Sequence, residues 1–163
     1  MAFNERYNNP RGGYSGGNRN SSQNRGNQSY ISESIEHIAL DEKNYVDKAE
    51  EIITKKLKKD RNGKPVLTTS KIRNILAMFS SLYDEIIHVQ GDVLPEELEG
   101  RIQYLRLHIA YEAGRENNVK DFVAQSDLLH QVSQIGNSKK KFLLCSKYME
   151  ALVAYHRFYG GKD

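Results

Sequence analysis

The chain has 163 residues, 28% of them charged, with a formal net charge of +3 and a single cysteine. This length predicts one domain with a tail. No apolar run approaches the roughly 20 residues that a membrane-spanning helix needs, and the polar, glycine-rich N-terminus is unlike a signal peptide. One cysteine excludes an intrachain disulfide and a cysteine-based metal site. A cytoplasmic protein with no membrane partner is therefore expected.

Residues 1–30 are dominated by Gly, Asn, Ser, Arg and Gln and contain almost no aliphatic side chain. Such a segment cannot offset its ordering entropy, so a disordered tail is predicted. Its run Arg11-Gly12-Gly13-Tyr14 is typical of segments that bind RNA loosely, and a merely solubilising tail is the alternative. The tail carries four arginines against Glu5, which leaves residues 31–163 neutral overall. Any nucleic-acid contact in the folded part must therefore come from local clusters of charge.

The folded part is predicted to be one helical domain, residues 31–163. Residues 31–40 are ambiguous and leave a helical extension open. A first amphipathic helix follows from Asp41 and is stopped by Asn62-Gly63 and Pro65. A second helix is capped by Thr68 or Thr69. The helical-period apolar positions of these two helices are Val46, Ala49, Ile53 and Leu57, and then Ile72, Ile75, Leu76, Phe79, Leu82, Tyr83 and Ile86.

Two further helices are predicted before the last one. The third begins near Glu96, where carboxylates in the first turn suit the helix dipole, and continues towards Ala113. The fourth is predicted as one helix ended by Gly136. Their apolar positions are Leu98, Ile102, Leu105 and Ile109, and then Val119, Phe122, Val123, Leu128, Leu129 and Val132.

The last helix is predicted to be central to the fold. Asn137 and Ser138 offer an N-cap, and Gly160 stands where a left-handed C-cap residue belongs. Because it has two apolar stripes, little of its circumference is polar, and other elements should surround it. The stripes are Phe142, Cys145, Met149, Leu152 and Tyr159, and Leu144, Tyr148, Ala151, Tyr155 and Phe158. The predicted fold is an all-α, compact bundle of about five helices with a disordered N-terminal tail.

The residue types that serve as catalytic groups in enzymes do not form a known catalytic motif in this sequence. The five histidines fall on separate predicted helices without His-Glu-x-x-His spacing, and no glycine-rich phosphate loop follows a strand. Cys145 is interpreted as a small buried hydrophobe. No catalytic residue, metal or cofactor is therefore predicted. A metal-independent ribonuclease that uses His108 or His156 as a general acid or base stays open as an alternative.

Basic residues suggest contact with phosphate groups. Lys71 and Arg73 follow Thr68-Thr69-Ser70 at the start of the second helix, where cations are disfavoured but free backbone N–H groups bind phosphate. The alternative is that both cations pair with carboxylates of a neighbouring helix. Lys139, Lys140 and Lys141 begin the last helix in the same way and form a second candidate patch with Lys147.

The third helix carries Arg101, His108 and Arg115 at intervals of seven residues. Such residues share one face, which would extend over about 21 Å and could follow several nucleotides. Arg106 is rotated by about 140° from Arg101 and should point elsewhere. The alternative is a solvated face with salt bridges to Glu97 or Glu112. Tyrosines 104, 111, 148 and 155 are assigned to core stripes or their edges, so phosphate contact without base stacking is predicted.

At these residues the chain resembles the small subunit of the type III-A CRISPR effector (Csm) complex. The resemblance covers about residues 44–163, and residues 1–40 depart from the usual pattern. It is carried by the runs Leu67-Thr68-Thr69-Ser70-Lys71-Ile72-Arg73-Asn74, Tyr104-Leu105-Arg106, Tyr111-Glu112-Ala113-Gly114-Arg115-Glu116, Val119-Lys120-Asp121, Lys147-Tyr148-Met149-Glu150-Ala151-Leu152-Val153-Ala154-Tyr155 and Phe158-Tyr159-Gly160-Gly161-Lys162-Asp163.

The resemblance implies a helical bundle without a catalytic centre. Several copies would stack beside the backbone subunits that carry the crRNA and line the channel in which crRNA and target RNA pair. Target RNA cleavage would belong to the backbone subunit, and DNA cleavage and cyclic oligoadenylate synthesis to the large polymerase/cyclase-domain subunit. The implied RNA-binding residues are Lys71, Arg73, Arg101, Arg106 and Arg115. A protein-interaction module without RNA contact is the competing interpretation.

Overall fold

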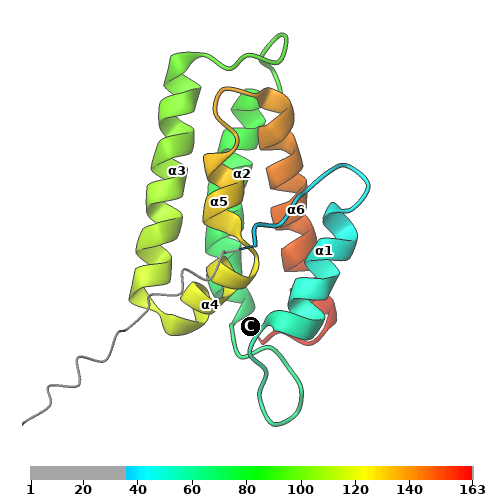
Figure 1. Ribbon diagram of the computed structural model, residues 1–163. Coiled ribbons are helices and arrows are strands. Elements are labelled where there is room, and N and C mark those ends of the chain that lie inside the picture. The colour runs from blue at the N-terminus through cyan, green and yellow to red at the C-terminus, as the bar shows by residue number, and fades with distance from the viewer. Residues whose placement is uncertain (1–35, 163) are drawn as a thin grey trace, which may run out of the picture. The chain divides into compact units, whose positions relative to one another are not determined.

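The computed structural model describes residues 36–162, which form a helical bundle (Figure 1). The described part contains six α-helices and one π-helical turn: α1 Tyr45–Glu51, η1 Ile52–Lys56, α2 Thr69–Ile86, α3 Glu96–Arg115, α4 Asn117–Gln125, α5 Leu128–Ser133 and α6 Lys139–Phe158. Its β structure is limited to two isolated bridges. The all-α prediction is confirmed. The predicted tail, residues 1–30, lies outside the described residues. No helix within residues 36–162 combines the length and the apolarity needed to cross a membrane.

Helix α6 packs mainly against α1 and α2 and also touches η1 and α5, which agrees with its predicted central place. Its buried side chains are Phe142, Cys145, Ser146, Tyr148, Met149, Leu152 and His156. The second predicted stripe is wrong at its end, because Phe158 is 77% exposed. The reason is that α6 ends there and Gly160 turns the chain away with a φ of 86°, in the left-handed conformation that the sequence predicted.

The first predicted helix changes its winding halfway. After α1 the backbone N–H of Leu57 donates to the carbonyl oxygen of Ile52 at 3.0 Å, five residues back, so each hydrogen bond of this π-helical type spans one residue more than in an α-helix. This winding allows Ile52, Ile53 and Leu57 all to be buried. Residues 36–40 are not helical, so the helical extension left open for residues 31–40 is absent from the described part of that stretch.

Helices α2 and α3 begin at Thr69 and Glu96, as the capping and charge patterns predicted. They run antiparallel, with α2 rising and α3 descending in Figure 1. Each buries one apolar stripe, which for α3 is Leu98, Ile102, Leu105, Ile109 and Ala113. The face of α3 that turns away from this stripe is therefore available for contacts outside the bundle.

The predicted fourth helix is two helices, α4 and α5, separated at Ser126 and Asp127. The buried Ser126 hydroxyl donates to the Phe122 carbonyl oxygen at 2.6 Å, and the Tyr148 hydroxyl of α6 donates to the Ser126 carbonyl oxygen at 3.0 Å. The chain then turns at Asp127, whose φ is 53°. The helix is interrupted at Asp127, because a left-handed residue cannot continue a right-handed helix, and the Tyr148 hydroxyl satisfies the Ser126 carbonyl group at the break.

Candidate nucleic-acid interface

The outer face of α3 carries both cations and aromatic rings. Tyr104, Leu107 and Tyr111 are 60%, 62% and 58% exposed, so the assignment of tyrosines 104 and 111 to the core is wrong. Tyr148 is fully buried, as expected. The two exposed tyrosines belong to the same side of α3 as Arg101, His108 and Arg115, because all five positions fall within about 80° of one another on the helix circumference. We call Arg101, Tyr104, His108, Tyr111 and Arg115 the α3 face.

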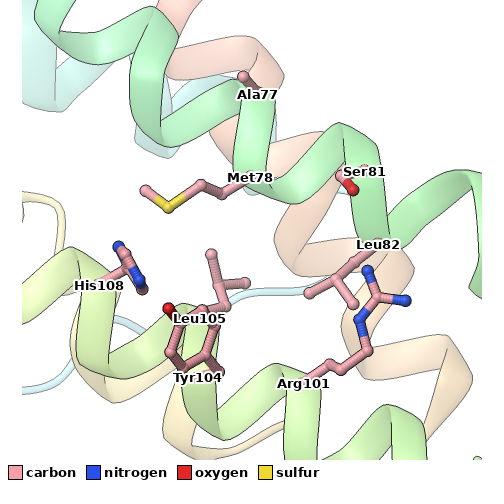
Figure 2. A pocket seen from close by; sticks show the side chains of 8 residues that line it. All are labelled: Ala77, Met78, Ser81, Leu82, Arg101, Tyr104, Leu105 and His108. Atoms are coloured by element: carbon pink, nitrogen blue, oxygen red, sulfur yellow. The ribbon is translucent and has the colours of Figure 1, made fainter.

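A hollow of about 430 Å³ opens between the α3 face and helix α2. Figure 2 shows Met78 of α2 above His108, and Arg101 of α3 at the other end of the hollow, below Leu82. The Tyr104 ring stands edge-on to the His108 ring, with centroids 4.4 Å apart. The residues that line the hollow are Ala77, Met78, Ser81, Leu82, Arg101, Tyr104, Leu105 and His108. The hollow is thus mostly apolar, with cationic and aromatic groups along one side.

Arg101, which lines this hollow, and Lys71 at the start of α2 each have a carboxylate partner. Lys71 Nζ lies 3.0 Å from Oε2 of Glu116, the residue directly after the end of α3. Arg101 pairs with Glu85 of α2. The side chains of Lys71 and Arg101 remain 44% and 39% exposed. The alternative of neighbouring-helix ion pairs is therefore realised for Lys71, and surface pairs of this kind are weak enough to exchange for a phosphate.

Arg115 ends the α3 face close to Lys71 of α2. Its guanidinium lies 5.4 Å from the centre of the Tyr111 ring and 3.4 Å from Glu112 Oε1. The Glu112 pair is one of the two salt bridges that the spacing of α3 offered as an alternative. The Arg115 side chain is 61% exposed, so its charge still reaches solvent. Lys71 and Arg115 therefore place two exposed cations at the same end of the α2–α3 pair.

Arg73 and Arg106 are exposed but lie off the α3 face. On the helical rotation, Arg106 points to the opposite flank of α3, as the spacing predicted. Within residues 36–162 neither side chain has a hydrogen-bond or ion-pair partner. The phosphate-binding corner predicted beside Arg73 is partly closed, because Thr69 is buried and its backbone N–H donates to the carbonyl oxygen of Lys162.

The three lysines that begin α6 lie at the other end of the bundle from Lys71 and Arg115 (Figure 1). Lys139 Nζ donates to the carbonyl oxygens of Ile87 and Val89 at 2.8 and 2.6 Å, which satisfies backbone groups where α2 ends. Lys140 and Lys141 are exposed, and the Lys140 backbone N–H donates a hydrogen bond to Asp92 Oδ1 at 2.7 Å. The structure thus gives Lys139 a capping role at the end of α2, two residues beyond Glu85, the partner of Arg101.

The groups considered for catalysis are placed unfavourably. His156 is fully buried, and burial lowers its pKa. Burial also raises the pKa of the Cys145 thiol to about 12, which keeps it protonated and unreactive at neutral pH. His108 is partly exposed, but its ring neighbour is Tyr104.

Three further residues, His37, Asp127 and His130, come together on another part of the bundle and offer metal-ligand atoms within 4.8 Å of one another.

Sequence reasoning missed this last group because His37 stands 90 residues from Asp127 in the chain. The spacing of Asp127 and His130 within one turn was a visible signal, but its partner could not be identified from sequence. The exposed tyrosines were missed for a different reason: they were assigned by their aromatic character, although the helical rotation places Tyr104 and Tyr111 at least about 100° from every buried position of α3.

Comparison with known proteins assigns the chain to a family. Residues 39–162 match the family described as Csm2 Type III-A. The chain belongs to the Csm2 family. The resemblance found in the sequence is thereby confirmed, and it places this Csm2-family chain among the small subunits of type III-A CRISPR complexes.

Named relatives agree with this assignment. The chain is 45% identical over 124 residues to the CRISPR system Cms protein Csm2 of Streptococcus thermophilus, which covers 76% of this chain and 98% of the relative. It is 39% identical over 119 residues to the protein of the same name in Mycobacterium tuberculosis (strain H37Rv). That alignment covers 73% of this chain and 94% of the relative. It is 41% identical over 95 residues to the Csm2 protein of Enterococcus italicus. That alignment covers 57% of this chain and 68% of the relative.

Proposed function

We propose that this chain is a non-catalytic small subunit of a type III-A CRISPR interference complex. It works in the cytoplasm, lines the channel that holds the crRNA–target RNA duplex, and bridges neighbouring subunits. Its partners are crRNA and target RNA, the backbone subunits, the large polymerase/cyclase-domain subunit and further copies of itself. The observation that carries the proposal is the α3 face, which presents exposed cations and aromatic rings, and of which Arg101, Tyr104 and His108 line a hollow, on a chain that belongs to the Csm2 family.

The chemistry of the face suits sequence-independent binding. Lys and Arg neutralise phosphates without reading bases, which lets base pairing alone select the target. Lys71, Arg101 and Arg115 are all partly exposed, and each is paired with a surface carboxylate that a phosphate can replace. Arg73 and Arg106 are exposed as well, but they lie off the α3 face and would contact RNA from other sides of the bundle.

The proposal is tested in the assembled complex with the variant Lys71→Ala/Arg101→Ala/Arg115→Ala. Affinity for two target RNAs of unrelated sequence should fall by the same factor. The slope of log Kd against log salt concentration should flatten by roughly 0.7–0.9 for each phosphate that the variant no longer neutralises. The matched control is Lys43→Ala/Lys55→Ala/Arg61→Ala, which removes as many exposed cations from the α1 side of the bundle. Equal affinity and slope in the two variants would overturn the proposal.

A second candidate function is a protein-interaction module without RNA contact. It is favoured by two apolar features: Met78 and Leu105 line the hollow, and Leu107 is exposed on another side of α3. A Leu107→Glu variant should weaken co-purification of the partner subunits if this surface binds protein. Retention of full RNA affinity by a complex that carries the triple cation variant would favour this second function.

A further inference from the structure

A short segment before α1 is fastened to the start of α5. The Ile38 backbone N–H donates to Asp127 Oδ2 at 3.0 Å, and Gln131 Nε2 donates to the Ile38 carbonyl oxygen at 2.7 Å. These bonds bring His37 next to Asp127 and His130. His37 Nδ1 lies 3.0 Å from Asp127 Oδ1, and the His37 and His130 rings stack with centroids 3.5 Å apart at 10°. Two imidazoles and a carboxylate therefore converge from two separate segments.

The backbone at Asp127 is unusual for the residue it carries. Asp127 is the one non-glycine residue with a positive φ within residues 36–162. An L-residue in this conformation is uncommon and is held by its surroundings. Here Oδ2 accepts hydrogen bonds from Ile38 N–H and from Gln131 Nε2, the latter at 3.2 Å. The carboxylate is therefore oriented by two donors on one oxygen while the other oxygen faces His37.

We propose that His37, Asp127 and His130 bind a divalent transition-metal ion of the zinc class. Their ligand atoms lie within 4.8 Å of one another. Zinc bonds to His nitrogen and carboxylate oxygen are roughly 2.0–2.2 Å long, so ligand atoms around one ion stand about 3–4 Å apart. To bind one ion, the His37 and His130 rings would leave their stacked arrangement and each turn a nitrogen towards the metal.

The donor set selects the class of metal. Two imidazoles and one carboxylate suit zinc, cobalt, nickel or copper, whereas magnesium and calcium prefer oxygen ligands alone. Gln131 and the Ile38 N–H act as outer-shell groups that orient the ligating carboxylate. The His37 side chain is 45% exposed, so an ion can enter from solvent and keep a water molecule as its fourth ligand.

Metal binding would stabilise the contact between two segments of the chain. The ion would join the segment of residues 36–40 to α5 more firmly than the hydrogen bonds alone. His37 lies outside residues 39–162, the part of the chain matched to the Csm2 family, so the family assignment does not bring this ligand set with it. The site shares no residue with the α3 face, so its test does not depend on the proposed RNA contact.

The test uses the full, tag-free chain with Co²⁺ alone, then Zn²⁺ alone, in a buffer that does not chelate. One Co²⁺ per chain should produce visible d–d absorption bands of a low-coordinate site, and Zn²⁺ should abolish them. Isothermal titration should give one Zn²⁺ per chain. Both His37→Ala and His130→Ala should weaken binding at least tenfold, and the midpoint of thermal unfolding should rise with Zn²⁺ in the wild type more than in either variant.

The matched control is His88→Ala, which removes an exposed histidine just after the end of α2. It should bind metal as the wild type does. Circular dichroism confirms that each variant is folded, and Asp127→Asn provides a second variant that preserves the size of the side chain. Absence of Co²⁺ bands in the wild type, or wild-type Zn²⁺ affinity in folded His130→Ala, would overturn the proposal.

Discussion

Lys71 Nζ at the start of α2 lies 3.0 Å from the Glu116 carboxylate beyond the end of α3. This pair joins the two helices that border the candidate RNA surface, and it occupies the cation with an internal anion. A phosphate that approaches Lys71 must displace Glu116. The same competition applies to Arg101 and its partner Glu85. The carboxylates should therefore weaken RNA binding.

Replacing this carboxylate should strengthen RNA binding. In Glu116→Gln the Lys71 charge is released, and affinity of the assembled complex for target RNA should rise by about two- to fivefold, the range expected for a surface ion pair. Fluorescence anisotropy at low and moderate salt measures the change. Glu51→Gln, which frees Lys48 on α1 from a partner at 3.8 Å, is the control and should leave affinity unchanged. Weaker binding by Glu116→Gln would show that Glu116 positions Lys71.

Lys139 should contribute to stability and little to RNA affinity. Its ammonium donates to the carbonyl oxygens of Ile87 and Val89, so Lys139→Met leaves these groups without that donor and should cost about 1–2 kcal/mol in the free energy of unfolding. Urea denaturation measures the loss. Lys140→Met is the neighbouring control and should change stability by less than about 0.5 kcal/mol, because its side chain is exposed. Equal stability of the two variants would contradict the capping role of Lys139.

His156 should make the bundle less stable in mild acid. Its Nε2 lies 2.8 Å from the Leu67 carbonyl oxygen, its Nδ1 is buried without a partner, and burial holds its pKa below the ordinary 6.5. As the pH falls below about 6.5 the unfolded chain takes up a proton that the folded chain resists, so the free energy of unfolding decreases. The loss continues until the pH reaches the lower folded pKa.

Urea denaturation at pH 7.5, 6 and 5 measures this dependence. His156→Gln should be less stable than the wild type at pH 7.5 but should lose less stability between pH 7.5 and 5. His88→Ala should keep the wild-type slope because its side chain is exposed. Identical slopes for His156→Gln and the wild type would show that another group controls the acid response.

Two glycine substitutions should act in opposite directions. A Cβ at Gly161 would overlap the His156 ring and stand 2.8 Å from the His156 carbonyl oxygen, so Gly161→Ala should destabilise the bundle by about 1–3 kcal/mol. Gly114 lies in α3 with nothing within 4 Å of the corresponding position, so Gly114→Ala should stabilise it by about 0.5–1 kcal/mol. Thermal unfolding of both variants measures the difference, and a loss of stability in Gly114→Ala would contradict the open surroundings.

The helices with a strong apolar period could be predicted from sequence. The start of α2 at Thr69, the start of α3 at Glu96 and the turn at Gly160 follow from local caps, charges and glycine preference. The division of α4 from α5 was not predicted: it lies at Asp127, a non-glycine residue in the left-handed conformation, next to a carbonyl group that the Tyr148 hydroxyl of a distant helix satisfies. The residues around Ser126 do not by themselves indicate that this partner will be there.

The candidate site was predicted in part. Periodicity alone predicted that Arg101, His108 and Arg115 share one face, and it separated Arg106 from them. It could not indicate that Lys71 pairs with Glu116 or that Lys139 binds backbone carbonyl groups, since both depend on how helices pack. The cluster of His37, Asp127 and His130 likewise exists only after the segment before α1 has folded against α5.

The winding of η1 has a consequence for the length of the chain at that point. Because the Leu57 N–H reaches back five residues to Ile52, one residue in this stretch is in excess of α-helical needs. Deleting one solvent-facing residue of this turn would convert the five-residue hydrogen bond into the four-residue bond of an α-helix, with Leu57 and the loop after it in about the same orientation. The pair of Asp60 and Lys162, 3.2 Å apart, should then persist. This turn is therefore a point where the chain should tolerate being one residue shorter.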